Sequence, residues 1–195
     1  MVKRDVEKDI LDAAARCFYA DGITATGVDR LAEEADVSKR TIYQHFGSKE
    51  GVVTAYLDRR EAQWRARLGE ELDPEAPLEE TLLTYLSVYM VWGDPDAARG
   101  CAFINASAEF ADPDHPGLAI VRASLDHVIA DLEAILLRSG VDDARGRAEE
   151  LAMVFVGSLG TLGMRRDRRV KAIAERLVRR LLAHADLAPP TPAQS

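Results

Sequence analysis

The sequence has little of what secreted, membrane-spanning or disulfide-linked proteins need. Its 195 residues include two cysteines, Cys17 and Cys101, which are too few for a disulfide framework. The N-terminal residues carry mixed charge and lack the apolar core of a signal peptide. No apolar run approaches the roughly 18 residues needed to span a bilayer. We therefore expect a cytoplasmic protein with reduced thiols and no membrane partner.

Motifs for catalysis and metal binding are also missing. The sequence has no nucleophile elbow, phosphate-binding glycine loop, HExxH or paired CxxC. Acidic and histidine side chains occur between residues 109 and 115, but their spacing matches no metal site and is typical of a turn between helices. We expect neither an enzyme nor a bound metal or cofactor.

Positive charge is scarce overall but concentrated at one place. Lys and Arg number 25 against 33 Asp and Glu, so the formal net charge is -8. An acidic chain argues mildly against a nucleic-acid partner. Residues 37–49, however, carry three positive charges and no acid. The local charge therefore allows a DNA contact there.

Apolar residues recur at helical spacing along most of the chain, and no run alternates as a strand would. The pattern predicts an all-α fold with about nine helices. The expected helices cover residues 5–19, 28–35, 39–45, 49–68, 78–92, 101–110, 118–138, 145–164 and 168–185.

The second and third expected helices have the spacing of a helix-turn-helix. Thr26 is the expected N-cap of the second, with Asp29 in a capping-box position. Ser38 and Ser48 are the expected N-caps of the third and the fourth. Ile42 and Phe46 are the expected inward anchors of the third helix. Its other side chains are cations, hydroxyls and amides, which hold phosphates and read base edges. A generic helical hairpin with a solvated basic face is the alternative.

Residues 26–50, TGVDRLAEEADVSKRTIYQHFGSKE, closely resemble the DNA-binding signature of the TetR family of bacterial transcriptional regulators. The resemblance covers about the first fifty residues. It implies that Thr26 caps its helix beside the DNA backbone and that part of the third helix faces the major groove. The residues implied in DNA binding are Thr26, Ser38, Lys39, Arg40, Thr41, Tyr43, Gln44, His45 and Lys49.

Three positions depart from the family pattern. Asp36 stands where glycine is usual in the turn, and Asp tolerates a left-handed backbone better than most residues. Arg40 also replaces a common glycine and adds a long donor. Gly51 stands where the family usually has a residue other than glycine. It is expected to weaken the start of the fourth helix by roughly 1 kcal/mol relative to alanine.

The resemblance also implies a domain organisation. Residues 1–50 would form the helix-turn-helix domain and residues 51–187 an all-helical ligand-binding and dimerisation domain. The proline-rich residues 188–195 are predicted to be a disordered tail.

Two further sites are predicted in the second half of the chain. Small residues in the eighth expected helix, and an apolar stripe in the ninth, favour a helix–helix interface between two subunits, although packing within one subunit is the alternative. The predicted dimer interface contains Gly157, Gly160, Thr161, Ile173, Leu177 and Leu181. Polar residues spaced by four on one helix face, with nearby aromatics, suggest a lined pocket or a buried hydrogen-bond network. The predicted pocket contains Tyr85, Tyr89, Trp92, Cys101, Phe103, Asn105, Glu109 and Phe155.

The sequence therefore predicts a homodimeric DNA-binding regulator. The resemblance implies a repressor that an unknown small molecule releases from a palindromic operator on double-stranded DNA. A ligand-independent regulator or activator is one alternative. A helical small-molecule-binding protein that binds no operator is another.

Overall fold

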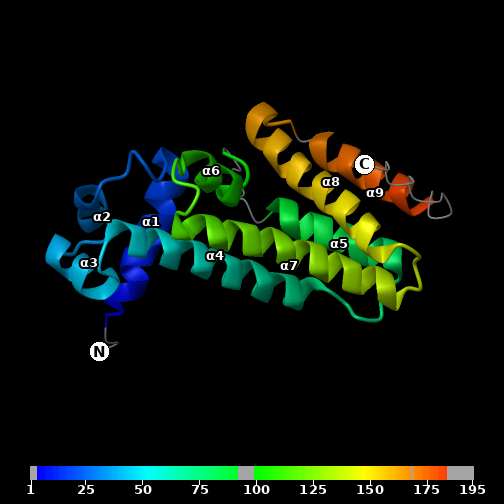
Figure 1. The fold of residues 1–195 in the computed structure, drawn as a ribbon, viewed down its shortest axis with the longest axis horizontal. Helices are drawn as coiled ribbons and strands as arrows, with labels where there is room; N and C mark the ends of the chain where they lie inside the picture. Colours follow the sequence, from blue (N-terminus) through cyan, green and yellow to red (C-terminus); the bar gives the residue numbers. More distant parts are fainter. Residues whose placement is uncertain (1–3, 92–98, 168, 184–195) are drawn as a thin grey trace. The chain divides into compact units, whose positions relative to one another are not determined.

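The computed structural model describes residues 4–91, 99–167 and 169–183. Within these ranges the regular elements are nine helices and no strands, so the all-α prediction is confirmed (Figure 1). In chain order the helices are α1 (Val6–Asp21), α2 (Val28–Glu34), α3 (Lys39–Phe46), α4 (Lys49–Glu71), α5 (Leu78–Val91), α6 (Ala102–Glu109), α7 (Pro116–Arg138), α8 (Ala144–Arg165) and α9 (Arg169–Ala183).

Side chains beside the helix ends explain several boundaries. The Asp5 carboxylate accepts the backbone N–H of Lys8 at 3.1 Å and caps α1. Gly22 ends α1 with φ +99°, a conformation that favours glycine. Helix α7 begins two residues earlier than predicted, at Pro116, because proline is well suited to the first helical position.

The described chain packs as two units. The first contains the described part of Met1–Ala66 together with Arg99–Ser124, and the second contains the described parts of Arg67–Ala98 and Leu125–Ser195. The packing unit around the helix-turn-helix is thus larger than the 1–50 domain predicted from the sequence. The domain boundaries, which concern DNA and ligand binding, stay a prediction, and the predicted tail lies outside the described residues.

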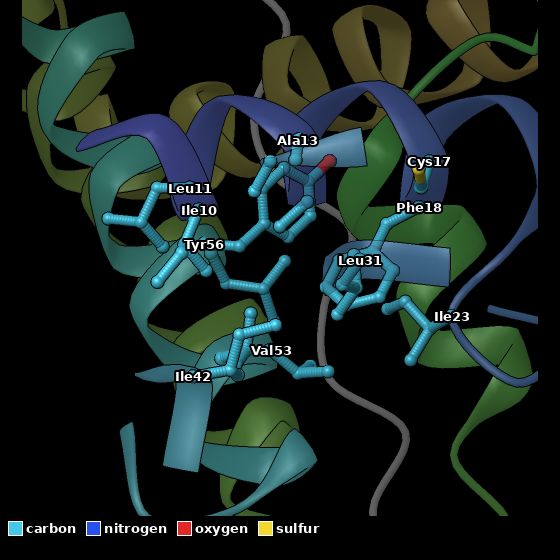
Figure 2. Packing of buried hydrophobic residues seen from close by; sticks show 14 of the residues in the cluster. Ile10, Leu11, Ala13, Cys17, Phe18, Ile23, Leu31, Ile42, Val53 and Tyr56 are labelled. Atoms are coloured by element: carbon cyan, nitrogen blue, oxygen red, sulfur yellow. The ribbon is translucent and has the colours of Figure 1, made fainter. Parts of the chain in front are cut away.

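The core of the first unit joins the first four helices. Figure 2 shows apolar side chains from α1, α2, α3 and α4 pointing toward one another. Phe18 of α1 and Tyr56 of α4 pack edge to face, with ring centroids 5.5 Å apart. Burial raises the pKa of the Tyr56 hydroxyl. Each large side chain buried here stabilises the unit by roughly 1.5–3 kcal/mol, so the short helices α2 and α3 depend on this core rather than on their own propensity.

The second unit is built on α5, α8 and α9, which lie side by side in Figure 1. Tyr85 of α5 and Phe155 of α8 are fully buried, and their ring centroids are 5.6 Å apart. Polar contacts add to this core: Lys171 Nζ donates to Ser87 Oγ at 3.0 Å, and Arg179 bonds Glu79 at 2.8 Å.

None of the described helices combines the length and the apolar composition required to cross a membrane.

Candidate nucleic-acid interface

Helix α3 is fixed at both ends by its own sequence. Ser38 Oγ accepts the backbone N–H of Thr41 at 3.0 Å, which confirms the predicted N-cap. Gly47 ends the helix with φ +74°, and its N–H bonds the Tyr43 carbonyl at 3.0 Å. Eight residues between two caps give a short, well-defined rod.

The two faces of α3 differ sharply. Ile42 is 0% exposed, and Phe46 is half-buried against the same core, so both predicted anchors are confirmed. The opposite face is exposed and carries Lys39, Arg40, Tyr43, Gln44 and His45. Tyr43 is 47% exposed, which is unusual for so large an aromatic side chain. The arrangement presents cations, an amide and a phenol to solvent from one rigid helix.

The turn before α3 contains a residue with a left-handed backbone. Asp36 has φ +51°, as the sequence predicts for a position where glycine is usual. The N–H of Val37 bonds the carbonyl of Ala32 at 3.0 Å across this turn. The departure from glycine therefore leaves the helix-turn-helix geometry intact.

The cations of this surface are not equivalent. Lys39 forms an ion pair with Asp29 of α2. Arg40 has no ion-pair partner among the described residues, and its guanidinium keeps five donors for a ligand. Lys49 Nζ lies 3.4 Å from the carbonyl of Thr24. Only Arg40 among these three is thus presented without a charged or carbonyl partner in the described part of the chain.

The predicted role of Thr26 as a cap is wrong. The N-cap of α2 is Gly27, and no side chain caps this helix. Thr26 is 2% exposed, and its hydroxyl donates to the Gly22 carbonyl at 2.7 Å. The hydroxyl satisfies the buried loop that leads into α2, and Asp29 pairs with Lys39 instead of completing a capping box.

The start of α4 offers a second set of donors. Ser48 Oγ accepts the N–H of Gly51 at 3.0 Å, so the predicted cap of this helix is confirmed. A helix N-terminus carries partial positive charge and unpaired N–H groups, which favour an anion. Lys49 and Ser48 therefore extend the basic surface beyond α3.

The residues predicted to line a pocket belong to different units. Tyr85, Tyr89 and Phe155 form a ring cluster in the second unit. The remaining described members, Cys101, Phe103, Asn105 and Glu109, belong to the first unit, and Trp92 lies outside the described residues.

In the first unit, two polar members of this set hold backbone. Glu109 Oε2 accepts the N–H of Thr24 at 2.6 Å, and Asn105 Nδ2 donates to the Arg99 carbonyl at 2.8 Å. Cys101 is buried at the N-cap of α6, and burial raises the pKa of its thiol. Asn105 and Glu109 also border a cavity of about 10 Å³, the size of one water molecule. The predicted ligand pocket stays a prediction.

An apolar groove lies between α8 and α9 in the second unit. Its volume is about 390 Å³, and its lining includes Gly157, Thr161, Ile173 and Leu177 of the predicted dimer interface. Nothing lies within 4 Å of the position that a Cβ at Gly157 would take. The small residue at this position is therefore not required by packing within the subunit.

Two exposed methionines on α8 were not among the predicted interface residues. Met153, which is 76% exposed, lines the groove, and Met164 is 81% exposed. Met153 lies four residues before Gly157, so helical spacing alone could have placed it on the same face. Apolar side chains that gather around an exposed groove indicate an interaction surface, whereas single exposed apolar residues scattered over a surface do not.

Comparison with known proteins agrees with this geometry. Residues 10–56 match the family described as "Bacterial regulatory proteins, tetR family". The HTH-type transcriptional repressor KstR2 of Rhodococcus jostii is 26% identical over 179 residues, which cover 80% of this chain and 77% of that protein. The HTH-type transcriptional regulator YjdC of Escherichia coli is 24% identical, and the match covers 91% of this chain and 94% of that protein.

Solved structures show the same fold. A TetR-family transcriptional regulator from Streptomyces coelicolor has a TM-score of 0.86 and 27% identity, with 93% of this chain and 96% of that chain covered. A TetR transcriptional regulator from Legionella pneumophila has a TM-score of 0.82 at 16% identity, covering 92% and 98% of the two chains.

Proposed function

Because the chain belongs to the TetR family of bacterial regulatory proteins and is a DNA-binding transcriptional regulator, we propose that it acts as a homodimeric repressor. The dimer would bind a palindromic operator and leave it when a small molecule binds. One relative is named a repressor, which supports this sign of regulation. The observation that carries the proposal is α3, a doubly capped helix with one buried face and one face of exposed cationic, amide and phenol side chains.

We assign separate proposed roles to the side chains on the exposed face of α3 and at the start of α4. Arg40 and Gln44 have the donors and acceptors that read guanine and adenine edges in the major groove. Lys39, Thr41 and the N-terminal turn lie beside them. Tyr43, His45, Ser48 and Lys49 are suited to phosphates, which position a recognition helix on the duplex. Thr26 is omitted from this set because its buried hydroxyl is bonded within the protein.

The groove between α8 and α9 is the proposed dimer interface. It contains apolar side chains around Gly157, where open space lets a second helix approach closely. Ile173 and Leu177 are 45% and 38% exposed in one chain, so burial by a partner would gain hydrophobic free energy. Two-fold symmetry would present two copies of α3 to major grooves about 34–36 Å apart and would therefore favour a palindromic operator.

Release by a small molecule requires that the molecule bind the DNA-competent and DNA-incompetent dimer geometries with different affinity. The ring cluster of Tyr85, Tyr89 and Phe155 is the proposed apolar part of the effector site. A regulator that responds to no ligand, an activator, or a helical small-molecule-binding protein without an operator would each lack one part of this mechanism.

Selection of bound duplexes from a random DNA library tests the proposal. We expect wild-type protein to enrich a palindrome, and Arg40→Ala and Tyr43→Ala to lose or alter it. Arg145→Ala is the matched control, because it removes an exposed cation of α8 that pairs with Glu133 and Glu149. No enrichment at low salt by a folded dimer would overturn operator binding.

Two further measurements separate the alternatives. Reporter output from the enriched operator, with and without the protein, distinguishes a repressor from an activator. A screen of small molecules against the operator complex tests release, and the Tyr89→Ala protein should lose any response because a wall of the proposed site is removed. Binding of a small molecule without a change in DNA affinity would refute the release step.

A further inference from the structure

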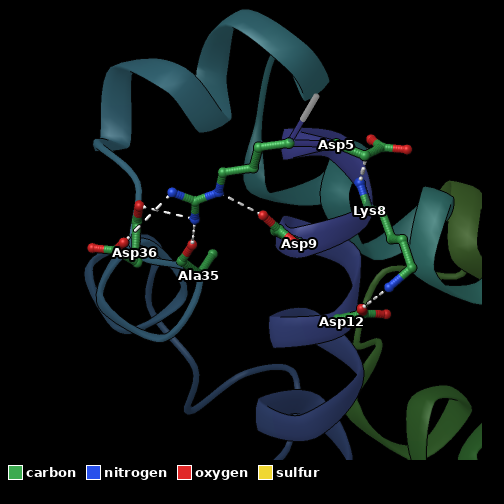
Figure 3. A network of polar contacts seen from close by, with 7 residues as sticks. Asp5, Lys8, Asp9, Asp12, Ala35 and Asp36 are labelled. Atoms are coloured by element: carbon green, nitrogen blue, oxygen red, sulfur yellow. Dashed lines mark hydrogen bonds and ion pairs between the residues drawn. The ribbon is translucent and has the colours of Figure 1, made fainter. Parts of the chain in front are cut away.

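Arg4 links the first turn of α1 to the turn between α2 and α3, whose Ala35 lies 31 residues away in sequence. It lies just before α1, and its Nε donates to Asp9 Oδ2 at 2.7 Å. Its Nη2 donates to the carbonyl oxygens of Ala35 at 2.7 Å and Asp36 at 3.2 Å. Its Nη1 lies 3.5 Å from the Asp36 carboxylate. In Figure 3, dashed lines run from one guanidinium to Asp9 on α1 and to Ala35 and Asp36 in the turn between α2 and α3.

The two carbonyl oxygens that Arg4 contacts lie where α2 ends and the turn begins. Ala35 is the C-cap of α2, and the last carbonyls of a helix have no partner within the helix. Asp36 follows with φ +51°, so the chain leaves the helix at once. A guanidinium is planar and has five N–H donors in a fixed fork. It can therefore donate hydrogen bonds to two successive carbonyl oxygens and to a carboxylate at the same time. A lysine ammonium has one nitrogen and matches this arrangement less well.

The same contacts connect the turn to α1. Asp9 lies in the first turn of α1, and the side chains of that helix form part of the core that also buries Ile42 of α3. The turn thus has a polar attachment to α1 on one side and the apolar anchor of α3 on the other. Two attachments restrict the angle at which α3 leaves the turn more strongly than one does.

We propose that Arg4 is a positioning residue for operator recognition: it fixes the turn between α2 and α3 and thereby the orientation of α3. This inference rests on the proposed operator binding. A cation near the N-terminus would otherwise be assigned to a DNA phosphate, where it would act directly as a point charge. In the described structure the guanidinium is already bonded to backbone carbonyls and to Asp9.

The two roles predict different behaviour for matched variants. A phosphate contact tolerates Arg4→Lys, because the charge remains, whereas the turn contact does not, because the fork is lost. Asp9→Asn also separates them. It removes the charged anchor of the guanidinium, so it weakens positioning but would free a phosphate-binding Arg4 and leave DNA affinity equal or higher.

The experiment measures affinities of the full-length protein for the enriched operator and for a scrambled duplex, at two salt concentrations. We expect Arg4→Ala and Arg4→Lys each to lower the operator-to-scrambled affinity ratio by about five- to tenfold, the effect of losing one or two hydrogen bonds. Asp9→Asn should lower it by about two- to threefold. Affinity for the scrambled duplex should change by less than about twofold, because phosphate contacts remain.

Lys8→Ala is the control, because Lys8 is also a cation of this region but pairs with Asp12 on α1 and not with the turn. It should leave the ratio unchanged. Loss of affinity for both duplexes together, with a salt dependence weakened by about one charge and rescue by Arg4→Lys, would overturn the proposal in favour of a phosphate contact. Equal loss on both duplexes without a change in salt dependence would indicate a general loss of folded protein and would also overturn it.

Hydrogen exchange separates this inference from the proposed function. If wild-type protein enriches no operator, the proposed function fails, but the turn can still be measured. Amides of residues 35–46 should then exchange faster in Arg4→Lys than in wild-type protein and in Lys8→Ala. Unchanged exchange in this segment would refute the positioning role whatever the protein does with DNA.

Discussion

Replacing Gly51 with alanine sets two effects of known size against each other. Gly51 lies in the first turn of α4, and its N–H is bonded by Ser48. Helix propensity alone predicts that alanine stabilises this position by at most about 1 kcal/mol. A Cβ built on Gly51, however, would lie far inside van der Waals contact with the carbonyl oxygen of Phe46 and 3.1 Å from its carbonyl carbon.

The steric effect should win because the obstacle is backbone. Side chains can rotate away from an added methyl group, whereas the Phe46 carbonyl closes α3 and accepts the N–H of Ser48 at 2.8 Å. Overpacking costs typically 1–3 kcal/mol, and loss of that hydrogen bond adds about 1 kcal/mol. After subtraction of the propensity gain, Gly51→Ala should destabilise the protein by about 1–3 kcal/mol. The end of α3 should shift, and operator affinity should fall with it.

Gly69→Ala is the matched control on the same helix. Nothing lies within 4 Å of a Cβ at Gly69, so propensity acts there alone. We expect this variant to be more stable by up to about 1 kcal/mol and to bind DNA normally. Thermal unfolding followed by circular dichroism should show a melting temperature lowered by about 2–12 °C for Gly51→Ala and slightly raised for Gly69→Ala. The reasoning fails if Gly51→Ala is as stable as wild-type protein and its α3 amides exchange no faster.

Two more predictions concern carboxylates of this unit. Asp29→Asn should release the side chain of Lys39, which is more than half exposed, so that its ammonium can contact a phosphate. DNA affinity should then rise about two- to fivefold at low salt and depend more steeply on salt, which titration of the operator at two salt concentrations would show. Hydrogen bonds from Lys8 and Arg59 lower the pKa of Asp12 below its usual 3.8, so the stabilisation is present above that pH and is lost as pH falls through the lowered pKa. Asp12→Asn should therefore cost about 1 kcal/mol in urea unfolding at pH 7, and this cost should shrink as pH falls through the lowered pKa of Asp12.

Matched substitutions control both experiments. Glu33→Gln removes another exposed acid of α2 and should change the salt dependence less than Asp29→Asn does, because Glu33 pairs with Arg30 and not with α3. A slope that is identical in the two variants would mean that Lys39 does not approach DNA. For the acid series, a difference between Asp12→Asn and wild-type protein that stays constant as pH falls from 7 through the lowered pKa would contradict the assigned cause.

Features that depend on a few adjacent residues could be predicted from the sequence. The sequence predicts Ser38 and Ser48 as caps because a hydroxyl just before a helix can accept a backbone N–H of the first turn. Ile42 was placed inward because helical spacing puts it on the face opposite Arg40 and Tyr43. Helix existence and the exposed surface of α3 follow from the same local rules.

Features that depend on distant contacts could not be predicted. Thr26 has the right chemistry for a cap, but the fold offers its hydroxyl a nearer acceptor in the Gly22 carbonyl. The Glu109 carboxylate accepts the N–H of Thr24, 85 residues away in sequence, and spacing along one helix face does not reveal this partner. Periodicity says which side of a helix is buried, but it does not say which backbone group will be there.

The close approach of the Phe46 carbonyl to Gly51 could not be predicted from the sequence either. From the sequence, a glycine near the start of a helix predicts only a small loss of helix propensity. The adjacent residues do not indicate that the last carbonyl of the preceding helix lies against this glycine. The correct sign of its substitution needs the position of the Phe46 carbonyl, which is a fact of three-dimensional packing.

The bond from Glu109 to Thr24 has a consequence for building chimeric regulators. A chimeric regulator that takes only residues 1–50 of this chain as its DNA-binding domain would be cut just after the helix-turn-helix. In this chain such a transplant would leave behind α6, whose Glu109 accepts the N–H of the loop leading to α2. The transplanted head would carry an amide without its acceptor and a core missing Ala106. A portable head must instead be assembled from two stretches of the gene, one encoding residues 1–66 and the other residues 99–124.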